Sequence, residues 1–220
     1  MKKIILTVCS ATLLLIACNS SETKETTTDS TGTTPVTTDV KKDEAWVPVD
    51  SATMMKAMID YGTPGEMHKL LASWNGTWSG ETTMWESEGA APQQSTGTGV
   101  NAMIYDGRYQ TSIHKGNMMG MPFEGRSVTG YDNATKKFVS TWIDTWSTGI
   151  MNMTGTWDAS TKTLTMSGTY PDITRPGKEC SMRQVTTVID DNTQRFDMYG
   201  PDHKTGKEYK MMEIKMTRKK

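Results

Sequence analysis

Short runs of alternating apolar and polar residues, separated by turn residues, fill the chain from residue 77 to residue 217. Such alternation predicts half-buried β-strands, and the Asp106-Gly107 step between two runs is a strong hairpin signal. The pattern predicts ten strands, at residues 77–86, 100–105, 108–115, 123–131, 137–143, 150–157, 164–170, 181–189, 194–199 and 209–217.

The predicted strands follow one another by hairpin steps, and no helical pattern interrupts them. A meander of this length has two exposed edge strands unless it closes on itself, and closure removes both edges. We therefore expect a mainly β fold, an antiparallel up-and-down barrel of the lipocalin or calycin type with about 8–10 strands. A barrel of this size has a lumen wide enough for one small ligand.

Two short helices are predicted before the strands. Residues 51–61 carry Met54, Met55, Met58 and Ile59 at helical spacing. The run Thr63-Pro64-Gly65-Glu66 has the pattern of a capping box, with Thr63 as the cap and Pro64 at the first helical position, and predicts a second helix to about Ser73.

The first 50 residues have a different character. Lys2 and Lys3 precede an apolar run that is too short for a permanent membrane span, which is the layout of a secretory signal. The residues Leu15-Ile16-Ala17-Cys18 resemble the bacterial lipobox, and the alternative is an ordinary signal with a chance cysteine. We expect a lipoprotein signal peptide at 1–17, a lipidated Cys18 with a disordered Ser/Thr-rich tether at 18–50, and a β-barrel domain at 51–220.

This layout predicts a protein of the cell envelope, held to a membrane through Cys18. In lipoproteins of the kind that the lipobox resembles, an Asp after the cysteine tends to retain the protein in the inner membrane. Asn19 follows here, which favours the outer membrane.

Charge and cysteine content narrow the possible functions. The chain has 24 Lys and Arg against 25 Asp and Glu, which does not suggest nucleic acid as a partner. Of the three cysteines, Cys9 leaves with the signal and Cys18 is lipidated, so Cys180 has no partner for an internal disulfide. A lone cysteine of this kind is more often a small buried hydrophobe than a nucleophile. The oligomeric state is not specified by these features.

The candidate ligand-binding residues lie on the predicted strands. Alternation places Trp142 and Asp144 on one face, and an aromatic ring beside a carboxylate is typical of a ligand-orienting pair in a mostly apolar pocket. Trp142 could equally belong to the barrel core, with Asp144 capping a turn. Arg108, Arg126 and Arg183 could bind a ligand carboxylate, or could point to solvent or pair with Asp144 or Glu81.

Histidine and methionine suggest further chemistry. His114 is the only histidine on a predicted strand, and the three histidines do not have the spacing of a metal site, a haem site or a catalytic triad. We therefore predict no cofactor and no metal. The 18 methionines, with Met118, Met119 and Met121 crowded in one loop, either line the core and a pocket or act as soft ligands for Cu(I).

Several motifs together resemble one protein family, the domain of unknown function 1579. They are Pro64-Gly65-Glu66-Met67-His68-Lys69-Leu70-Leu71, Gly76-Thr77-Trp78-Ser79-Gly80-Glu81, Asp106-Gly107-Arg108-Tyr109, Pro122-Phe123-Glu124-Gly125, Gly130-Tyr131-Asp132-Asn133 and Ser140-Thr141-Trp142-Ile143-Asp144. The resemblance covers residues 52–218 and implies a lipocalin-like barrel, but no activity. The Gly-x-Trp step at Trp78 also looks like the start of lipocalin and fatty-acid-binding barrels, where a Trp closes one end.

Three functions remain open from the sequence. The first is a barrel that binds a small apolar or amphipathic ligand, through residues drawn from Trp78, Arg108, His114, Arg126, Trp142, Asp144 and Arg183. The second is a packed barrel with a structural or interaction role. The third is an isomerase-like or cyclase-like enzyme that uses Asp144 with Arg126 or His114 as acid and base.

Overall fold

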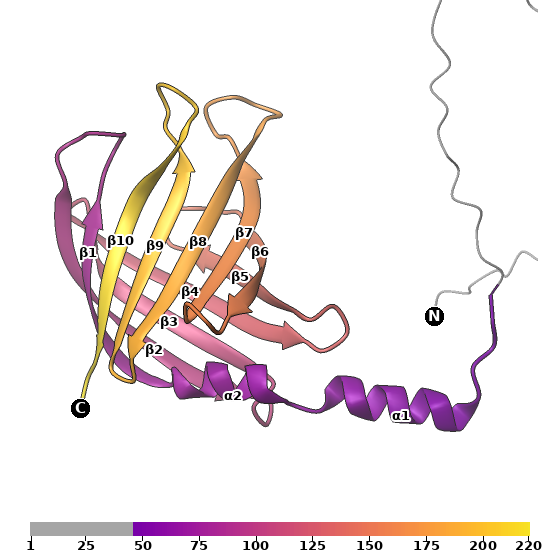
Figure 1. The fold of residues 1–220 in the computed structure, drawn as a ribbon. Helices are drawn as coiled ribbons and strands as arrows, with labels where there is room; N and C mark the ends of the chain where they lie inside the picture. The colour runs from indigo at the N-terminus through magenta and orange to yellow at the C-terminus, as the bar shows by residue number, and fades with distance from the viewer. Residues whose placement is uncertain (1–45) are drawn as a thin grey trace, which may run out of the picture. The chain divides into compact units, whose positions relative to one another are not determined.

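The first and last strands of the chain pair with each other and close the sheet (Figure 1). The computed structural model describes residues 46–220. Two helices, α1 and α2, precede the strands β1 to β10. In order, their bounds are Ser51–Gly62, Glu66–Ser73, Gly76–Met84, Gln93–Ile104, Tyr109–Met118, Met121–Asp132, Lys137–Asp144, Met151–Asp158, Thr163–Pro171, Glu179–Asp190, Thr193–Pro201 and Glu208–Arg218.

Each strand pairs antiparallel with the next, and β1 pairs with β10, so the predicted antiparallel up-and-down barrel is confirmed. The connections are hairpins, in which residues such as Gly107 adopt a positive φ of 82°. A β-carbon is disfavoured in that conformation, which is why Asp-Gly is a reliable turn signal. Residues 48–220 form one compact unit, which contains the whole closed ladder.

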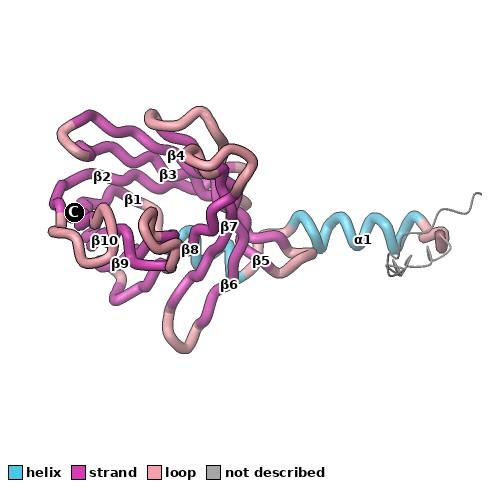
Figure 2. Tube along the Cα trace, turned by 90° about the horizontal axis from the view of Figure 1, so that it is seen from above, coloured by secondary structure: helices cyan, strands magenta, loops and turns pink. Residues whose placement is uncertain are grey.

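Glycines allow the sheet to bend sharply between β6 and β7. A β-carbon at Gly155 would lie 2.0 Å from the carbonyl oxygen of Thr165, and one at Gly168 would lie 2.3 Å from that of Asn152. The two strands therefore approach more closely than side chains would permit, as happens at barrel corners. A similar approach joins β2 to β3, where a β-carbon at Gly97 would lie 2.9 Å from the carbonyl oxygen of Lys115. The view in Figure 2 shows the strands from above.

The hydrophobic core joins α2 to inward-facing residues of β5 to β8. It consists of Leu71, Trp74, Phe138, Met153, Leu164, Met166 and Met182, all of which are buried. Leu71 and Trp74 come from α2 and its C-terminal cap, so this short helix and its end plug one end of the barrel (Figure 1). That end is called the closed end below, and the other end is called the mouth.

Hydrogen bonds fix the closed end to the barrel wall. The indole of Trp78 on β1 donates to the carbonyl oxygen of Trp74 over 3.0 Å, and Arg218 on β10 stacks on the Trp78 ring, with its guanidinium carbon 4.3 Å from the centroid. The same guanidinium donates to the carbonyl oxygen of Ser73 over 2.8 Å. The side chain of Gln110, which is buried, donates to the carbonyl oxygen of Leu71 over 2.5 Å.

The predicted capping box at Thr63 and Glu66 is wrong. Thr63 is instead the C-terminal cap of α1, where its hydroxyl donates to the carbonyl oxygen of Ile59. α2 begins at Glu66, and its cap is Gly65, whose backbone N–H donates to Nδ1 of His68 over 2.9 Å. The prediction of two short helices with the second ending at Ser73 is confirmed.

The bounds of one strand differ clearly from prediction. β2 begins at Gln93 instead of Val100, because the run from Gln93 to Gly99 is polar and glycine-rich and shows no apolar alternation. The signal peptide, Cys18 and the tether as far as residue 45 lie outside the described residues. Within residues 46–220, neither helix has the length and apolar character needed to cross a bilayer.

Candidate functional site

The inward-facing residues form two chemically different walls. Phe138 is fully buried and therefore faces inward. Residues directly opposite each other on paired strands lie on the same face, so the strand register identifies the inward-facing residues of the other strands. On β2 to β5 this face is mostly small or polar, with Ser95, Gly97, Gly99, Ser112, His114, Gly116, Gly125, Ser127, Thr129 and Ser140. It also carries the larger Met103, Phe123, Tyr131, Phe138 and Trp142. On β6 to β10 it is mostly apolar, with Met151, Met153, Leu164, Met166, Met182, Phe196, Met198, Met212, Ile214 and Met216, and it also carries Gln184, Thr186 and Gln194.

A cluster of rings lies on the polar wall towards the mouth. His114 on β3 and Trp142 on β5 have ring centroids 5.7 Å apart. Phe123 on β4 stacks on Trp142 with centroids 6.3 Å apart, and Trp146 packs edge-on against Phe123 at 5.9 Å. We call His114, Phe123, Trp142 and Asp144 the ring site, since Asp144 holds the Trp142 indole by a 2.8 Å hydrogen bond to Nε1.

Two glycines provide the space that these rings occupy. A β-carbon at Gly125 would lie 2.1 Å from Cζ2 of Trp142, and one at Gly99 would lie 3.1 Å from the His114 ring. Gly125 is opposite both His114 and Asp144 across the ladders, so the six-membered ring of the Trp142 indole lies over a strand position that has no side chain. The backbone, and not only neighbouring side chains, therefore sets the position of Trp142.

His114 supplies the polar chemistry of the site. Desolvation within the barrel lowers the pKa of the imidazole below its ordinary value of 6.5, so the ring is neutral at pH 7. A neutral imidazole has one N–H donor and one acceptor nitrogen. No hydrogen bond among residues 46–220 involves this ring. Asp144, by contrast, is occupied by Trp142 and by the backbone N–H groups of Trp146 and Ser147, both at 2.9 Å.

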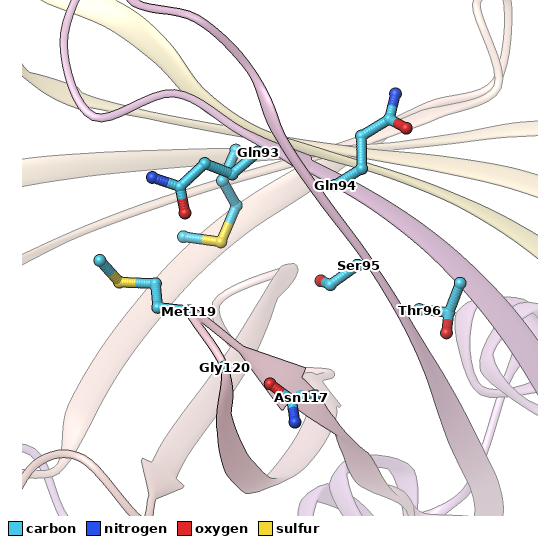
Figure 3. A pocket seen from close by; sticks show the side chains of 8 residues that line it. Gln93, Gln94, Ser95, Thr96, Asn117, Met119 and Gly120 are labelled. Atoms are coloured by element: carbon cyan, nitrogen blue, oxygen red, sulfur yellow. The ribbon is translucent and has the colours of Figure 1, made fainter.

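A hollow of about 450 Å³ lies at the mouth, where β2 and β3 separate (Figure 3). The β2–β3 ladder ends at the pair Gly97 and Gly116. Beyond that pair β2 and β3 no longer hydrogen-bond to each other, and the hollow lies between them. Its lining residues are Met84, Gln93, Gln94, Ser95, Thr96, Asn117, Met119 and Gly120.

Three of these residues, Met84, Gln93 and Ser95, belong to the inward-facing series, so the hollow borders the lumen. Its lining residue Asn117 follows Gly116, which is two residues from His114 and opposite Phe123. The hollow and the ring site are therefore neighbours on the polar wall, and together they form the candidate functional site. A volume of this size lies within the range of about 300–1,000 Å³ that is usual for small-molecule sites.

The predicted arginines do not reach the lumen. Arg126 lies on the outer face of β4, where it pairs with Glu124 at 2.9 Å. Arg183 lies on the outer face of β8, where it pairs with Glu208 at 2.7 Å and stacks on Tyr199 at 3.9 Å from the ring centroid. Arg108 is at the β2–β3 turn of the closed end and donates to the carbonyl oxygen of Tyr105. Of the two placements that the sequence leaves open, the structure shows the outward one for Arg126 and Arg183, and it places Arg108 in a turn.

The other candidates from the sequence are inward-facing but lie at different ends. Trp78 is at the closed end under Arg218, where it closes the barrel. His114, Trp142 and Asp144 come together near the mouth. A second hollow, of about 420 Å³, is bordered mainly by outward-facing residues of β7 and β8 together with Glu208, and is not part of this site.

Several members of the site were not predicted from the sequence. Phe123, Gly99 and Gly125 belong to it because the barrel register brings them beside His114 and Trp142. The motif Pro122-Phe123-Glu124-Gly125 is visible in the sequence, but the role of Gly125 depends on Trp142 of the neighbouring strand β5. Among residues 46–220, no three His, Cys, Asp or Glu side chains are arranged to hold a metal ion.

Known structures share this architecture. The crystal structure of Rv2717c from M. tuberculosis superposes with a TM-score of 0.51 at 11% identity, covering 72% of this chain and all of that one. The S-type phycobiliprotein lyase CPES from Guillardia theta gives a TM-score of 0.50 at 8% identity, covering 74% of this chain and 97% of the lyase. At these identities the likeness is one of fold. No curated protein sequence matches the chain.

A family model described as "Protein of unknown function (DUF1579)" matches residues 63–218. The match begins at the entry to α2 and ends with the last residue of β10, so it takes in the barrel and its plug. The chain therefore belongs to the DUF1579 family.

Proposed function

We propose that this protein is a lipid-anchored protein of the bacterial cell envelope that binds a small amphipathic ligand in the mouth half of its barrel. The observation that carries the proposal is the ring site. There a neutral His114, with no hydrogen bond of its own in the described structure, faces the lumen beside an aromatic cluster and a hollow of about 450 Å³.

The two walls indicate the chemistry of the ligand. The apolar wall would bury the hydrocarbon part of the molecule against methionines, which adapt to irregular shapes. The polar wall would present the hydroxyls of serine and threonine and the imidazole of His114 to the other side. Because His114 is neutral and Asp144 is occupied, the matching ligand group is an uncharged donor or acceptor, such as a hydroxyl or an amide, rather than a carboxylate.

The division of the barrel supports a binding role over a wholly packed interior. The core residues lie on α2 and β5 to β8, whereas Ser127, Thr129, Ser140 and Trp142 remain half-buried although they face inward. Small polar residues fill a core less efficiently than Met or Leu, which favours an incompletely packed lumen on their side. The acid–base pair of Asp144 with Arg126 receives no support, because Arg126 lies on the outer face.

The envelope part of the proposal is supported by the sequence alone. The run from Leu15 to Cys18 resembles a lipobox, and the Ser/Thr-rich residues after it would serve as a tether to the outer membrane. Incorporation of a labelled fatty acid by the host, lost in Cys18→Ser, is the expected result. Equal labelling of both forms would overturn this part and leave the ligand proposal untouched.

The ligand proposal is tested by titrating residues 46–220 with an environment-sensitive amphipathic dye and with long-chain alcohols and amides as competitors. His114→Phe keeps a ring against Trp142 and removes both nitrogens, so binding is expected to weaken by about tenfold, the loss of one hydrogen bond in a desolvated site. Arg126→Ala, on the outer face of β4, is the matched control and should bind like the wild type. Absence of any dye binding, or equal binding by all three proteins, would contradict the proposal.

A further inference from the structure

Helix α1 has an apolar face whose side chains are all exposed in the described structure. At 100° per residue, Met54, Met55, Met58, Ile59 and Tyr61 lie on one side, and their exposed fractions are 51%, 54%, 61%, 60% and 59%. The other side carries Thr53, Lys56 and Asp60, and the last two form an ion pair. No residue of α1 is buried.

This helix is capped and attached despite its lack of a packing partner. Asp50 accepts from the backbone N–H groups of Ala52 and Thr53, both at 3.0 Å. At its other end, the side-chain amide of Asn133 donates to the carbonyl oxygens of Tyr61 and Thr63, both at 2.9 Å. Isolated helices of this length are marginal in water and draw their stability from an amphipathic face that packs. Because both ends of α1 are hydrogen-bonded while its apolar face is exposed, we expect that face to pack on another surface.

The chain before α1 indicates which surface. Trp46, Val47 and Val49 continue the exposed apolar residues towards the N-terminus, with exposed fractions of 89%, 75% and 60%. Tryptophan and tyrosine favour the membrane–water interface. Cys18 lies 32 residues before Asp50 in the sequence, so the chain between them cannot hold α1 farther than about 110 Å from an acyl group on Cys18. If Cys18 is acylated, α1 stays within reach of the bilayer.

We propose that α1 lies in the plane of a lipid surface, with Met54, Met58 and Tyr61 at the boundary between headgroups and acyl chains. The charged residues Lys56 and Asp60 pair with each other on the opposite side of α1, so the apolar face itself carries no charge. Such a face matches the apolar part of a lipid bilayer better than a charged protein surface. The contact is hydrophobic and does not require acylation of Cys18, nor does it require a ligand in the lumen.

The contact would also orient the barrel. Asn133 lies in the β4–β5 turn at the closed end, and three residues separate α1 from α2. A lipid-bound α1 therefore holds the closed end towards the bilayer, and the mouth with its hollow opens away from it. A ligand would enter from the aqueous compartment.

Vesicle co-sedimentation of residues 46–220, which carry no acyl group, tests the inference. The wild type is expected to bind vesicles of phosphatidylcholine alone as well as vesicles with added phosphatidylglycerol, because the face is neutral. The double variant Met54→Glu with Met58→Glu should lose at least about tenfold in partitioning. Lys56→Gln, on the polar face, is the matched control and should partition like the wild type. Circular dichroism of each variant confirms that the barrel is intact.

Three results would overturn the proposal: no sedimentation of the wild type, equal partitioning of the double Glu variant, or binding only to anionic vesicles. Sedimentation velocity without lipid gives the remaining alternative. A dimer that disappears in the double Glu variant, together with no vesicle binding, would assign the face to a second copy of the chain instead of to lipid.

Discussion

The indole Nε1–H of Trp142 donates to Oδ2 of Asp144 over 2.8 Å, from two residues earlier on the same strand. The other carboxylate oxygen accepts from the backbone N–H groups of Trp146 and Ser147. Asp144 thus joins the inward-facing ring to the start of the β5–β6 loop. Its role in this structure is to hold the indole against Gly125, where the ring forms part of the lumen wall.

Gly125→Ala is expected to displace the Trp142 ring. The new β-carbon would lie 2.1 Å from Cζ2, so the indole must leave its seat and the hydrogen bond to Asp144 must break. Near-ultraviolet circular dichroism should change, and dye binding should weaken by more than tenfold, about the effect of losing a ring contact and a hydrogen bond. Gly149→Ala, where a β-carbon meets nothing within 4 Å, is the control. Unchanged dye affinity in Gly125→Ala would show that the position of the Trp142 ring does not affect binding.

Stability is expected to fall as the pH drops below about 6.5. The folded state lowers the pKa of His114 through desolvation, and desolvation also lowers that of His68. A histidine with a lowered folded pKa binds its proton less readily than in the unfolded chain, so its stabilising effect is complete above about pH 6.5 and declines as the pH falls towards the folded pKa. Urea midpoints measured at pH 8 and at about pH 5.5 should differ, since most carboxylates titrate lower.

His114→Gln should reduce this pH dependence without removing it, because His68 remains. A profile that is unchanged in His114→Gln would show that the ring is not desolvated in the folded protein. A profile that rises towards acid pH would show that a histidine gains an anionic partner on folding, which is contrary to the structure.

The closed end should be the most sensitive part of the barrel to substitution. Trp78→Ala removes a fully buried ring and its hydrogen bond to Trp74, and should cost about 3–5 kcal/mol in the free energy of unfolding. Arg218→Ala leaves the carbonyl oxygens of Ser73 and Asn75 without a donor and should cost about 1.5–3 kcal/mol. Arg126→Ala, in an exposed pair with Glu124, should cost less than about 1 kcal/mol. Chemical denaturation of the three variants checks the order, and a cost for Arg126→Ala equal to that of Arg218→Ala would contradict it.

The corner between β6 and β7 should not tolerate a side chain. In Gly155→Ala the added carbon would lie 2.0 Å from a backbone oxygen, which cannot rotate away as a side chain would. The free energy of unfolding should fall by at least the about 1–3 kcal/mol that is typical of an overpacked core. A lower urea midpoint would measure this loss. Gly149→Ala again provides the control. If Gly155→Ala is as stable as the wild type, the two strands do not approach as closely as the structure places them.

The architecture was predictable because turn residues and alternation act locally. Asp106-Gly107 and similar steps mark hairpins wherever they occur, and a meander of ten strands has few ways to avoid open edges. β2 was predicted too short, since Gln93 to Gly99 pairs through its backbone and offers no hydrophobic signal. The capping box failed because α2 begins at Glu66 with Gly65 as its cap, so Thr63 lies too early to cap it and instead ends α1.

The site was less predictable because alternation gives the period of a strand but not which face is inside. The choice of the Trp142 and Asp144 face agrees with the structure. For Arg126 and Arg183 alternation left both faces open, and the structure shows the outer one. Gly125 and Arg126 are neighbours, so the strand that brings the glycine against the indole necessarily turns the arginine outwards. Which face of β4 points inward depends on its pairing with β3 and β5, and the sequence of β4 alone does not specify that pairing.

Native mass spectrometry of residues 46–220, isolated gently from the host of origin, tests whether the lumen binds a ligand. A ligand-binding lumen should give an adduct of a few hundred daltons (about the mass of a molecule that fits a small-molecule site) that is lost on denaturation and weakened in His114→Phe. A bare protein mass, unchanged after incubation with amphipathic lipids, alcohols and amides, would contradict a ligand-binding lumen and assign the function to the outer surface of the barrel.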